Sequence, residues 1–380
     1  MGGIGVAQPQ YWYLNNQNPA LLVYNNITVF QAGAMGESRT VSSDSLSEKN
    51  IGGNLNYLAT AFPVKVNRWS TSLGLMPYTS VNYSVEYLDY AYDPEGAIRD
   101  TLAAKESGSG GLTQFYWANG VRLNRQFAIG LRAAYIFGPI ETKYLNRTTN
   151  NEQSIPYLIR IAEKTNAKDF LLTAGLSFSK DSIGRRNAYR LSVGTTYSLK
   201  TKLKADQRTE TARMTLSENV VEADTLLTRG GALNIPGAFT FGVSWSKRNI
   251  WTIGTEFSYQ DWTKFRSINK DDEGLAESWR AAIGGELTPD PMAGENYLKR
   301  VTYRVGLVYE KYPFIVAGNP VNDFGINFGF SLPAGRSSLD LAFKVGKRGD
   351  KAENLLEENY FKVYFGITFN DQWFIRRKFD

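Results

Sequence analysis

The stretch Phe324-Gly325-Ile326-Asn327-Phe328-Gly329-Phe330-Ser331-Leu332 places an apolar side chain at every second position and a small or polar one between. The same alternation returns in residues 339–346 and 361–369, with polar turns between the segments. A period of two puts alternate side chains on opposite faces of a β-strand. Segments of about ten residues with this pattern, recurring along a chain, are typical of a transmembrane β-barrel.

The composition favours one large barrel. The 380 residues contain no linker rich in Pro, Ser or charge that would divide them into domains. No apolar run approaches the roughly 18 residues of a spanning helix. The mean hydropathy of -0.33 is low for a membrane protein, but only half of each barrel strand faces lipid, so the average conceals the apolar face.

Residue usage also restricts the chemistry. The chain has neither Cys nor His, which removes thiol nucleophiles, the commonest general base and the commonest metal ligands. We therefore predict no enzyme activity, no metal and no cofactor. The 43 basic and 37 acidic residues are spread along the chain, a distribution that does not favour nucleic-acid binding.

About 14 segments are predicted to be strands. An even number of antiparallel strands can close on itself, which leaves no backbone group unpaired in lipid. The fold class is therefore all-β, a transmembrane antiparallel barrel. The segments are 27–34, 54–63, 69–90, 112–123, 127–144, 169–179, 187–200, 236–246, 250–262, 277–288, 299–310, 321–331, 337–347 and 360–370.

The two faces of the strands are predicted from the alternation. Apolar side chains face lipid, whereas Arg132, Arg190, Arg304 and Lys344 share a register with small polar residues and face the lumen. On the lipid face each such charge would cost roughly 2–4 kcal/mol at mid-membrane. Glu256, Asp261 and Asp340 are predicted to form salt bridges with lumen arginines rather than a catalytic site.

Turn lengths and aromatic residues predict the orientation and depth of the barrel. Long polar loops are expected at one end, which outer-membrane barrels place outside the cell. Tryptophans near predicted strand ends would form interfacial girdles. The expected loops are 36–52, 91–111, 145–168, 201–235 and 263–276, and the expected interfacial residues are Trp117, Trp251, Trp262 and Trp373.

Two soluble architectures are less consistent with the pattern. A propeller requires a repeat of roughly 40 to 50 residues with a fixed motif, which the sequence lacks. A sandwich rarely holds this many long strands with so many aromatic residues facing outward.

Residues 1–26 do not resemble a strand. Met1–Ala7 is rich in glycine and is followed by an aromatic and amide-rich stretch. It lacks the charged and apolar regions of a secretory signal, so we expect any signal to have been cleaved or left out. Two interpretations are open, a disordered leader and a plug that folds into the lumen. The expected organisation is a hatch over 1–26 and a barrel over 27–380.

Several motifs, in their order along the chain, resemble one family. Met1–Ala7 followed by Asn18–Leu22 resembles the N-terminal hatch of the FadL family, the outer-membrane transporters of long-chain fatty acids and other hydrophobic compounds. Residues 235–265 are similar to the family's proline, strand, Trp, strand, Tyr-x-x-Trp-Ser-x-Phe stretch, with Thr263 in place of Ser. Residues 328–374 resemble less familiar FadL-like proteins.

The resemblance implies specific roles for a few residues. Asn18, Pro19 and Ala20 would be hatch residues. In the family, ligand leaves sideways through a gap at a kinked strand, and Pro77 would create such a gap because proline removes a hydrogen-bond donor and bends a strand. The alternative is a turn at Pro77 that divides 69–90 into two strands. Apart from the resemblance, the basic residues that follow Trp373 predict that it anchors in the interface or contacts a partner protein.

Two functions remain open for this Gram-negative outer-membrane barrel. The first is passive uptake of hydrophobic compounds such as long-chain fatty acids, with the surrounding membrane lipid receiving the ligand. The second is a non-transporting barrel subunit or scaffold of a multi-protein complex for protein secretion or barrel assembly. Uptake predicts a continuous apolar pocket above the hatch, and a scaffold predicts a lumen filled by side chains and a large protein-contact surface.

Overall fold

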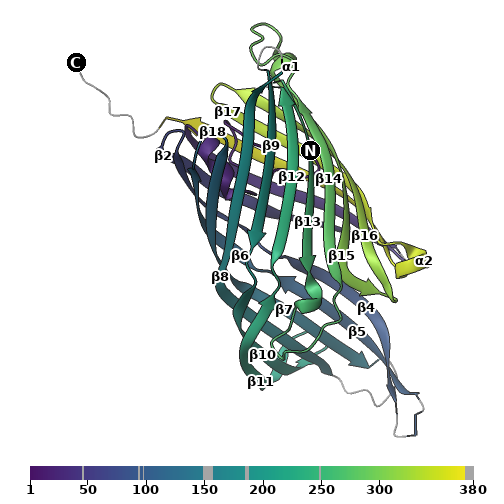
Figure 1. The fold of residues 1–380 in the computed structure, drawn as a ribbon. Coiled ribbons are helices and arrows are strands. Elements are labelled where there is room, and N and C mark those ends of the chain that lie inside the picture. Colours follow the sequence, from purple (N-terminus) through teal and green to yellow (C-terminus); the bar gives the residue numbers. More distant parts are fainter. Residues whose placement is uncertain are drawn as a thin grey trace.

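The computed structural model describes residues 1–44, 47–92, 95–96, 98–148, 157–184, 188–247 and 250–372. Eighteen strands form one continuous antiparallel sheet (Figure 1). Helical structure is limited to short segments such as η1 (Pro19–Tyr24), η3 (Trp262–Lys264), α1 (Tyr297–Arg300) and α2 (Lys351–Asn354). None of the helices in the described part of the chain has the length and apolar character needed to cross a membrane.

Fourteen strands close into a barrel, as the sequence pattern predicted. The last strand pairs with the first from Thr28↔Asp371 to Ser42↔Glu357, which completes the ring. In order around the wall the strands are β1 (Thr28–Ser42), β2 (Ser47–Lys65), β3 (Trp69–Pro77), β6 (Thr113–Arg122), β7 (Phe127–Thr148), β8 (Tyr157–Ile183), β9 (Tyr189–Ser198), β12 (Ala238–Lys247), β13 (Trp251–Asp261), β14 (Glu277–Leu287), β15 (Thr302–Val316), β16 (Asn319–Ala334), β17 (Ser337–Arg348) and β18 (Glu357–Asp371).

The length of the shortest strands indicates where the membrane lies. Strands β3, β6, β9 and β12 are 9 or 10 residues long, and a tilted strand needs about 9–11 residues to cross the hydrocarbon core. Strands β7 and β8 are 22 and 27 residues long. About half of each therefore projects beyond the membrane on the side away from the chain termini.

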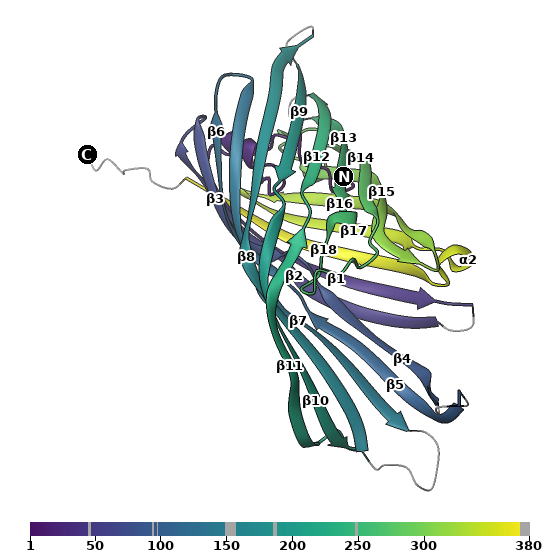
Figure 2. The ribbon, with the colours of Figure 1, turned by 60° about the horizontal axis from the view of Figure 1, so that its bottom comes forward.

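Two hairpins extend these projecting halves into a second, external sheet. β4 (Val81–Tyr92) and β5 (Ile98–Gly110) form one hairpin, and β10 (Thr201–Thr215) and β11 (Val220–Ile235) form the other. β5 pairs with 140–148 of β7, and β10 pairs with 157–168 of β8. We call the resulting six-stranded arrangement β4-β5-β7-β8-β10-β11 the external sheet, and Figure 2 shows it projecting from the end of the barrel.

The external sheet corrects several expectations. The predicted strand 69–90 is two strands, because Pro77 ends β3 and the backbone N–H groups of Tyr78 and Thr79 both donate to the Leu112 carbonyl in a turn. The predicted loops 91–111 and 201–235 are largely β5, β10 and β11. Likewise, β1 and β2 extend into the predicted loop 36–52, and β7 and β8 extend into the predicted loop 145–168. Charges dominated these segments, but Lys202 and Lys204 are exposed while Leu203 and Ala205 are buried, so the charges mark one face of a strand.

Candidate functional site

The N-terminal segment, residues 1–26, lies inside the barrel. All six residues of η1 are buried. The Gly5 and Val6 N–H groups donate to Glu256 of β13, at 2.8 and 2.9 Å, and the Ser244 hydroxyl of β12 donates to the Ala7 carbonyl at 2.7 Å. The segment is therefore fixed to the wall through its backbone.

A row of glycines on the inner wall lets the segment approach this closely. Cross-strand pairs join most of the row, including Gly120↔Gly130, Gly130↔Gly175, Gly242↔Gly194, Gly254↔Gly284 and Gly284↔Gly306. A Cβ added at Gly120 would lie 2.5 Å from the Pro19 carbonyl oxygen, and one at Gly284 2.6 Å from that of Met1. We call this row the glycine belt: Gly120, Gly130, Gly175, Gly194, Gly242, Gly254, Gly284 and Gly306.

Asn18, Pro19 and Ala20 lie together against this belt. The Asn18 side chain is fully buried; it accepts from the Ala20 N–H at 3.0 Å and donates to the Val6 and Leu176 carbonyls at 2.8 and 3.1 Å. It thereby caps η1, and Pro19 begins the helix where its missing N–H costs nothing. The arrangement explains the residue types, and the role of these three residues as a hatch stays a prediction.

Charged side chains hold the rest of the segment. Glu256 is 6% exposed and its Oε1 lies 3.2 Å from Arg280, which also donates to the Gly2 carbonyl. Arg190 donates to the Tyr11 hydroxyl at 2.6 Å and to Asp181, while Arg132 donates to the Asn16 carbonyl. These contacts confirm that the charges predicted for the lumen face inward.

Beside the segment, a network of ion pairs occupies the lumen between β1 and β13–β18. Arg304 pairs with Glu286 at 3.1 Å and with Asp340 at 3.9 Å, and the Gln8 side chain donates to Glu286 at 3.0 Å. The predicted pairing of Glu256 and Asp340 with lumen arginines is confirmed. Asp261, in contrast, pairs with Lys264 at 2.8 Å, because it ends β13 beside a turn.

A second layer of the same network centres on Asp323, whose side chain is fully buried. It contacts Arg348 at 3.2 Å and Lys344 at 3.6 Å, and it accepts from the Tyr360 hydroxyl at 2.7 Å. Arg348 also pairs with Glu358 at 3.4 Å. Because each carboxylate has cationic partners, the desolvation cost of the layer is offset by attraction.

On the opposite side of the lumen, apolar side chains form a cluster with the segment. Leu14 and Leu22 of the segment pack with residues of β6–β8, β10 and β11, and Tyr78, Phe265 and Ile268 pack on the edge of the cluster. Side chains inside the lumen are what the scaffold alternative predicted, and that alternative stays a prediction. Wall members of this cluster include Tyr116, Ile136, Leu171, Leu203 and Ile235.

At Pro77 the structure shows an interruption of the wall rather than a kinked continuous strand. Pro77 still pairs with Thr113 of β6, but β2 pairs with β3 only from Leu58 onwards. Residues 47–57 of β2 have β1 on one side and no strand on the other within the described residues. A cavity of about 290 Å³ lies there, lined by Asn54, Leu55, Met76, Pro77, Thr79 and Pro139, among others.

The predicted interfacial tryptophans occupy different environments. Trp251 begins β13 and contacts the ring of Tyr189, and Trp262 begins η3. Trp117 lies in the middle of β6 (Thr113–Arg122), 55% exposed, and not near either end of the strand. That corrects its expected place at a strand end. Trp373 lies outside the described residues, and the interfacial role of the others stays a prediction.

Sequence reasoning did not identify the glycine belt. The signal was present, because glycine recurs at an inward position near the middle of consecutive strands, but it was interpreted only as the small residue of the alternation. Other inward glycines hold rings instead: a Cβ at Gly33 would lie 2.8 Å from the Tyr57 ring, and one at Gly74 2.6 Å from that of Tyr116.

The whole chain, residues 1–380, matches the family model described as BamG. No match was found among curated protein sequences. Solved structures share the fold at low identity. The toluene transporter TodX of P. putida is 13% identical with a TM-score of 0.61, over 99% of this chain and 100% of that one.

Two further structures agree with this likeness. A FadL homologue of Pseudomonas aeruginosa is 10% identical with a TM-score of 0.60, over 95% of both chains. The monoaromatic hydrocarbon channel CymD is 11% identical with a TM-score of 0.59, over 98% of this chain and 96% of that one. The predicted FadL-like barrel is therefore confirmed as a fold.

The glycine belt predicts the effect of one added methyl group. Gly194→Ala places its Cβ on the Val6 carbonyl, and relieving such overpacking costs roughly 1–3 kcal/mol. Because the chain lacks Cys, Val6→Cys, at a site 1% exposed, reports the displacement through maleimide labelling. We expect Gly194→Ala to raise the labelling rate by about tenfold or more. Gly36→Ala, with nothing within 4 Å, is the control; equal rates would contradict the prediction.

Loss of the Glu256 carboxylate should release the first residues. Glu256→Ala removes the acceptor of the Gly5 and Val6 N–H groups and leaves Arg280 without this partner, at a cost of about 3–5 kcal/mol. Hydrogen–deuterium exchange should show faster deuterium uptake in residues 1–14. Glu163→Ala, at an exposed position of β8, should leave uptake unchanged. Protection that persists in Glu256→Ala would mean that other contacts hold the segment.

Proposed function

The chain belongs to the BamG family, and we propose that it is a non-transporting barrel subunit of a multi-protein complex in a Gram-negative outer membrane. Such a complex would serve protein secretion or barrel assembly. The observation that carries the proposal is the external sheet, which presents apolar side chains and open strand edges beyond the length needed to span the membrane.

The apolar side chains of the external sheet lie outside the lipid-facing band. Apolar residues gathered on a surface away from lipid mark protein contacts. On β11, residues 220–231 are all exposed. The exposed apolar residues of the sheet include Tyr83, Val85, Tyr87, Leu88, Tyr90, Ile159, Ile161, Val220, Val221, Leu226 and Leu227.

The two edges of the external sheet support the same proposal. Among the strands that the structure describes, β4 pairs with β5 alone. On the far side of β11 the described residues provide only the bridge Asn234↔Arg266. A strand edge with unpaired N–H and C=O groups accepts a strand from another protein, and the side chains then select the partner.

The contacts that anchor the N-terminal segment inside the barrel support a structural role over passage of ligand. We propose that residues 1–26 act as a hatch, with Asn18, Pro19 and Ala20 as its centre, inside a barrel formed by 27–380. The Glu256–Arg280 ion pair holds the hatch on one side of the lumen, and the apolar cluster around Leu14 and Leu22 holds it on the other. Opening it would break buried contacts that each cost several kcal/mol.

A shortened hairpin tests this function. Deleting residues 207–229 joins Asp206 to Gly230, and an Asp-Gly pair closes a two-residue hairpin between the cross-strand partners Ala205 and Gly231. The core residues Leu203 and Ile235 are retained, so the barrel should still form. We expect the full chain, gently extracted from native membranes, to bring down stoichiometric protein partners that the shortened chain loses.

Mass spectrometry of both co-purifying proteins and bound lipids distinguishes a subunit of a complex from a barrel that takes up hydrophobic compounds. A shift in gel mobility on boiling verifies that the shortened barrel is folded. A solitary full-length barrel enriched in a fatty acid or similar apolar molecule would overturn the structural role.

Uptake of hydrophobic compounds is a second candidate. The cavity beside Pro77, at the interruption between β2 and β3, favours it, since a ligand released there would reach the surrounding lipid. The hydrocarbon channels with the same fold add support. The ligand would be an apolar molecule such as a long-chain fatty acid.

Filling this cavity tests the second candidate separately. Thr79→Trp places a large side chain in the space lined by Leu55, Met76 and Pro77. If ligand leaves here, uptake of labelled fatty acid by cells should fall at least severalfold, whereas protein partners are retained. Thr142→Trp on β7, away from this cavity, is the control, and unchanged uptake in Thr79→Trp would exclude the route.

A further inference from the structure

On β8 the outward face changes abruptly from aromatic to basic. Tyr135, Phe137 and Phe170 form contacting pairs, with ring centroids 5.7 and 5.2 Å apart. The partner β9 ends at Ser198, opposite Thr173 of β8. Residues of β8 before about Phe170 therefore leave the hydrocarbon, and this aromatic group lies at the boundary.

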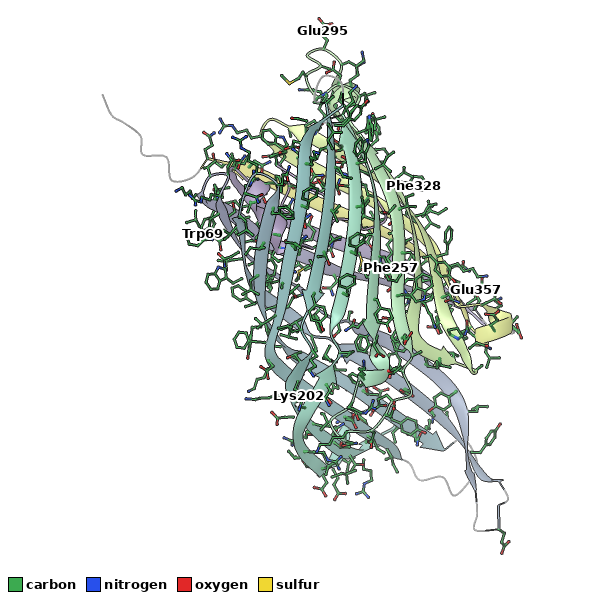
Figure 3. The ribbon with its side chains drawn as sticks, in the orientation of Figure 1. Trp69, Lys202, Phe257, Glu295, Phe328 and Glu357 are labelled. Carbon is green, nitrogen blue, oxygen red and sulfur yellow. The ribbon has the colours of Figure 1, made fainter. Side chains whose placement is uncertain are left out.

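Cations begin on the same face immediately beyond these rings. Strand alternation places Lys164, Lys168 and Phe170 on one face of β8, and Lys202, Lys204 and Arg208 on the corresponding face of β10. All five cations are exposed. Figure 3 shows Lys202 on the outer side of the wall where the barrel meets the external sheet. We call Lys164, Lys168, Lys202, Lys204 and Arg208 the basic strip.

The pairing of the strip sets like charges against one another. Lys168 is the direct cross-strand partner of Lys204, and Lys164 that of Arg208. Like charges directly opposite in a sheet are destabilising. Two cations facing each other at each of two levels would gain stability from an anion that binds between them.

Local carboxylates neutralise only part of this charge. Arg208 pairs with Glu210 at 2.7 Å, and Asp206 lies between the two like-charge pairs. On β7, Glu141 pairs with Lys143 at 3.1 Å. Within the described part of the chain, the four lysines of the strip have no carboxylate at ion-pair distance.

The neighbouring strand leaves space for a ligand. The cross-strand partners of Lys204, Asp206 and Arg208 on β11 are Ala232, Gly230 and Thr228. These residues are small, so an anionic group could approach the ammonium and guanidinium groups from the membrane side without meeting bulky side chains.

We propose that the basic strip binds the phosphate groups of anionic lipid headgroups in the surrounding leaflet. The position of the basic strip favours lipid as the source of the phosphate. The cations lie on the same strand face as the last lipid-facing rings, just beyond them, at the depth of the lipid phosphates. The charged ends of lysines turn toward this layer while their stems cover the rings. The attraction between these cations and phosphate groups acts within a Debye length of about 8 Å. Headgroups adjacent to the strip lie within this distance.

The test measures retention of a phosphate lipid. The full chain in neutral detergent is titrated with phosphatidylglycerol or zwitterionic phosphatidylcholine, and bound lipids are counted by native mass spectrometry. We expect preferential binding of phosphatidylglycerol, and Lys168→Gln with Lys204→Gln should weaken it by roughly tenfold. Phosphatidylcholine binding should not change. Lys270→Gln with Lys299→Gln, exposed lysines outside the strip, is the charge-matched control and should bind as the original chain does.

Each alternative has its own outcome. Because Lys168→Gln with Lys204→Gln removes a repulsion, the variant should fold, and mobility on boiling verifies this; Lys164→Gln with Lys168→Gln gives a second test. Unchanged phosphatidylglycerol binding in both variants would overturn the proposal. Displacement of the lipid by equimolar inorganic phosphate would indicate a free-anion site, and loss of a co-purifying protein with lipid retained would indicate a protein contact. Either result would also overturn it.

Discussion

The pairing of the first strand with the last is the constraint on which the rest of the structure depends. A sheet in hydrocarbon cannot leave N–H and C=O groups unpaired, and the register from Thr28↔Asp371 to Ser42↔Glu357 satisfies both edges along the full length of β1. Closure also creates an enclosed lumen. Three sets of groups occupy that volume here: the N-terminal segment, ion pairs and apolar side chains.

The three sets of groups in the lumen are stabilised in different ways. Backbone of the segment 1–26 lies directly on wall backbone at five glycines of the belt, so a side chain there would displace the segment: Gly120, Gly130, Gly194, Gly284 and Gly306. Around Asp323 the wall strands supply complementary charges, which remain tolerable because each has a partner. Near Tyr116 and Ile136 the filling is an ordinary apolar core. This division explains why mean hydropathy describes the protein poorly.

The sequence was sufficient for the barrel but not for what projects from it. Strands such as β16 and β18 have one face in lipid, so their alternation is strong and predicts both strand and facing. In β10 and β11 neither face is in lipid, charged residues are frequent and apolar residues do not recur at every second position, so the pattern resembles a loop. Pro77 predicted a break, but only the structure distinguishes a kink from a turn, since that depends on whether β2 continues alongside. The positions of Asn18, Pro19 and Ala20 depend on contacts with Gly130 and Gly175 that lie more than a hundred residues away.

The seam between β1 and β18 joins strands at opposite ends of the chain. Contacts with this sequence separation form late, because the entropy of closing the longest loop opposes them until the intervening strands have paired. Residues 1–26 precede β1 directly, and their glycine contacts lie on β6–β9 and β12–β15. They can therefore be laid on the wall while the sheet is still open and be enclosed when the seam closes. Residues 1–26 would then be enclosed while the barrel assembles and would not have to be threaded into a closed barrel. The order of strand pairing would determine whether they lie in the lumen at all.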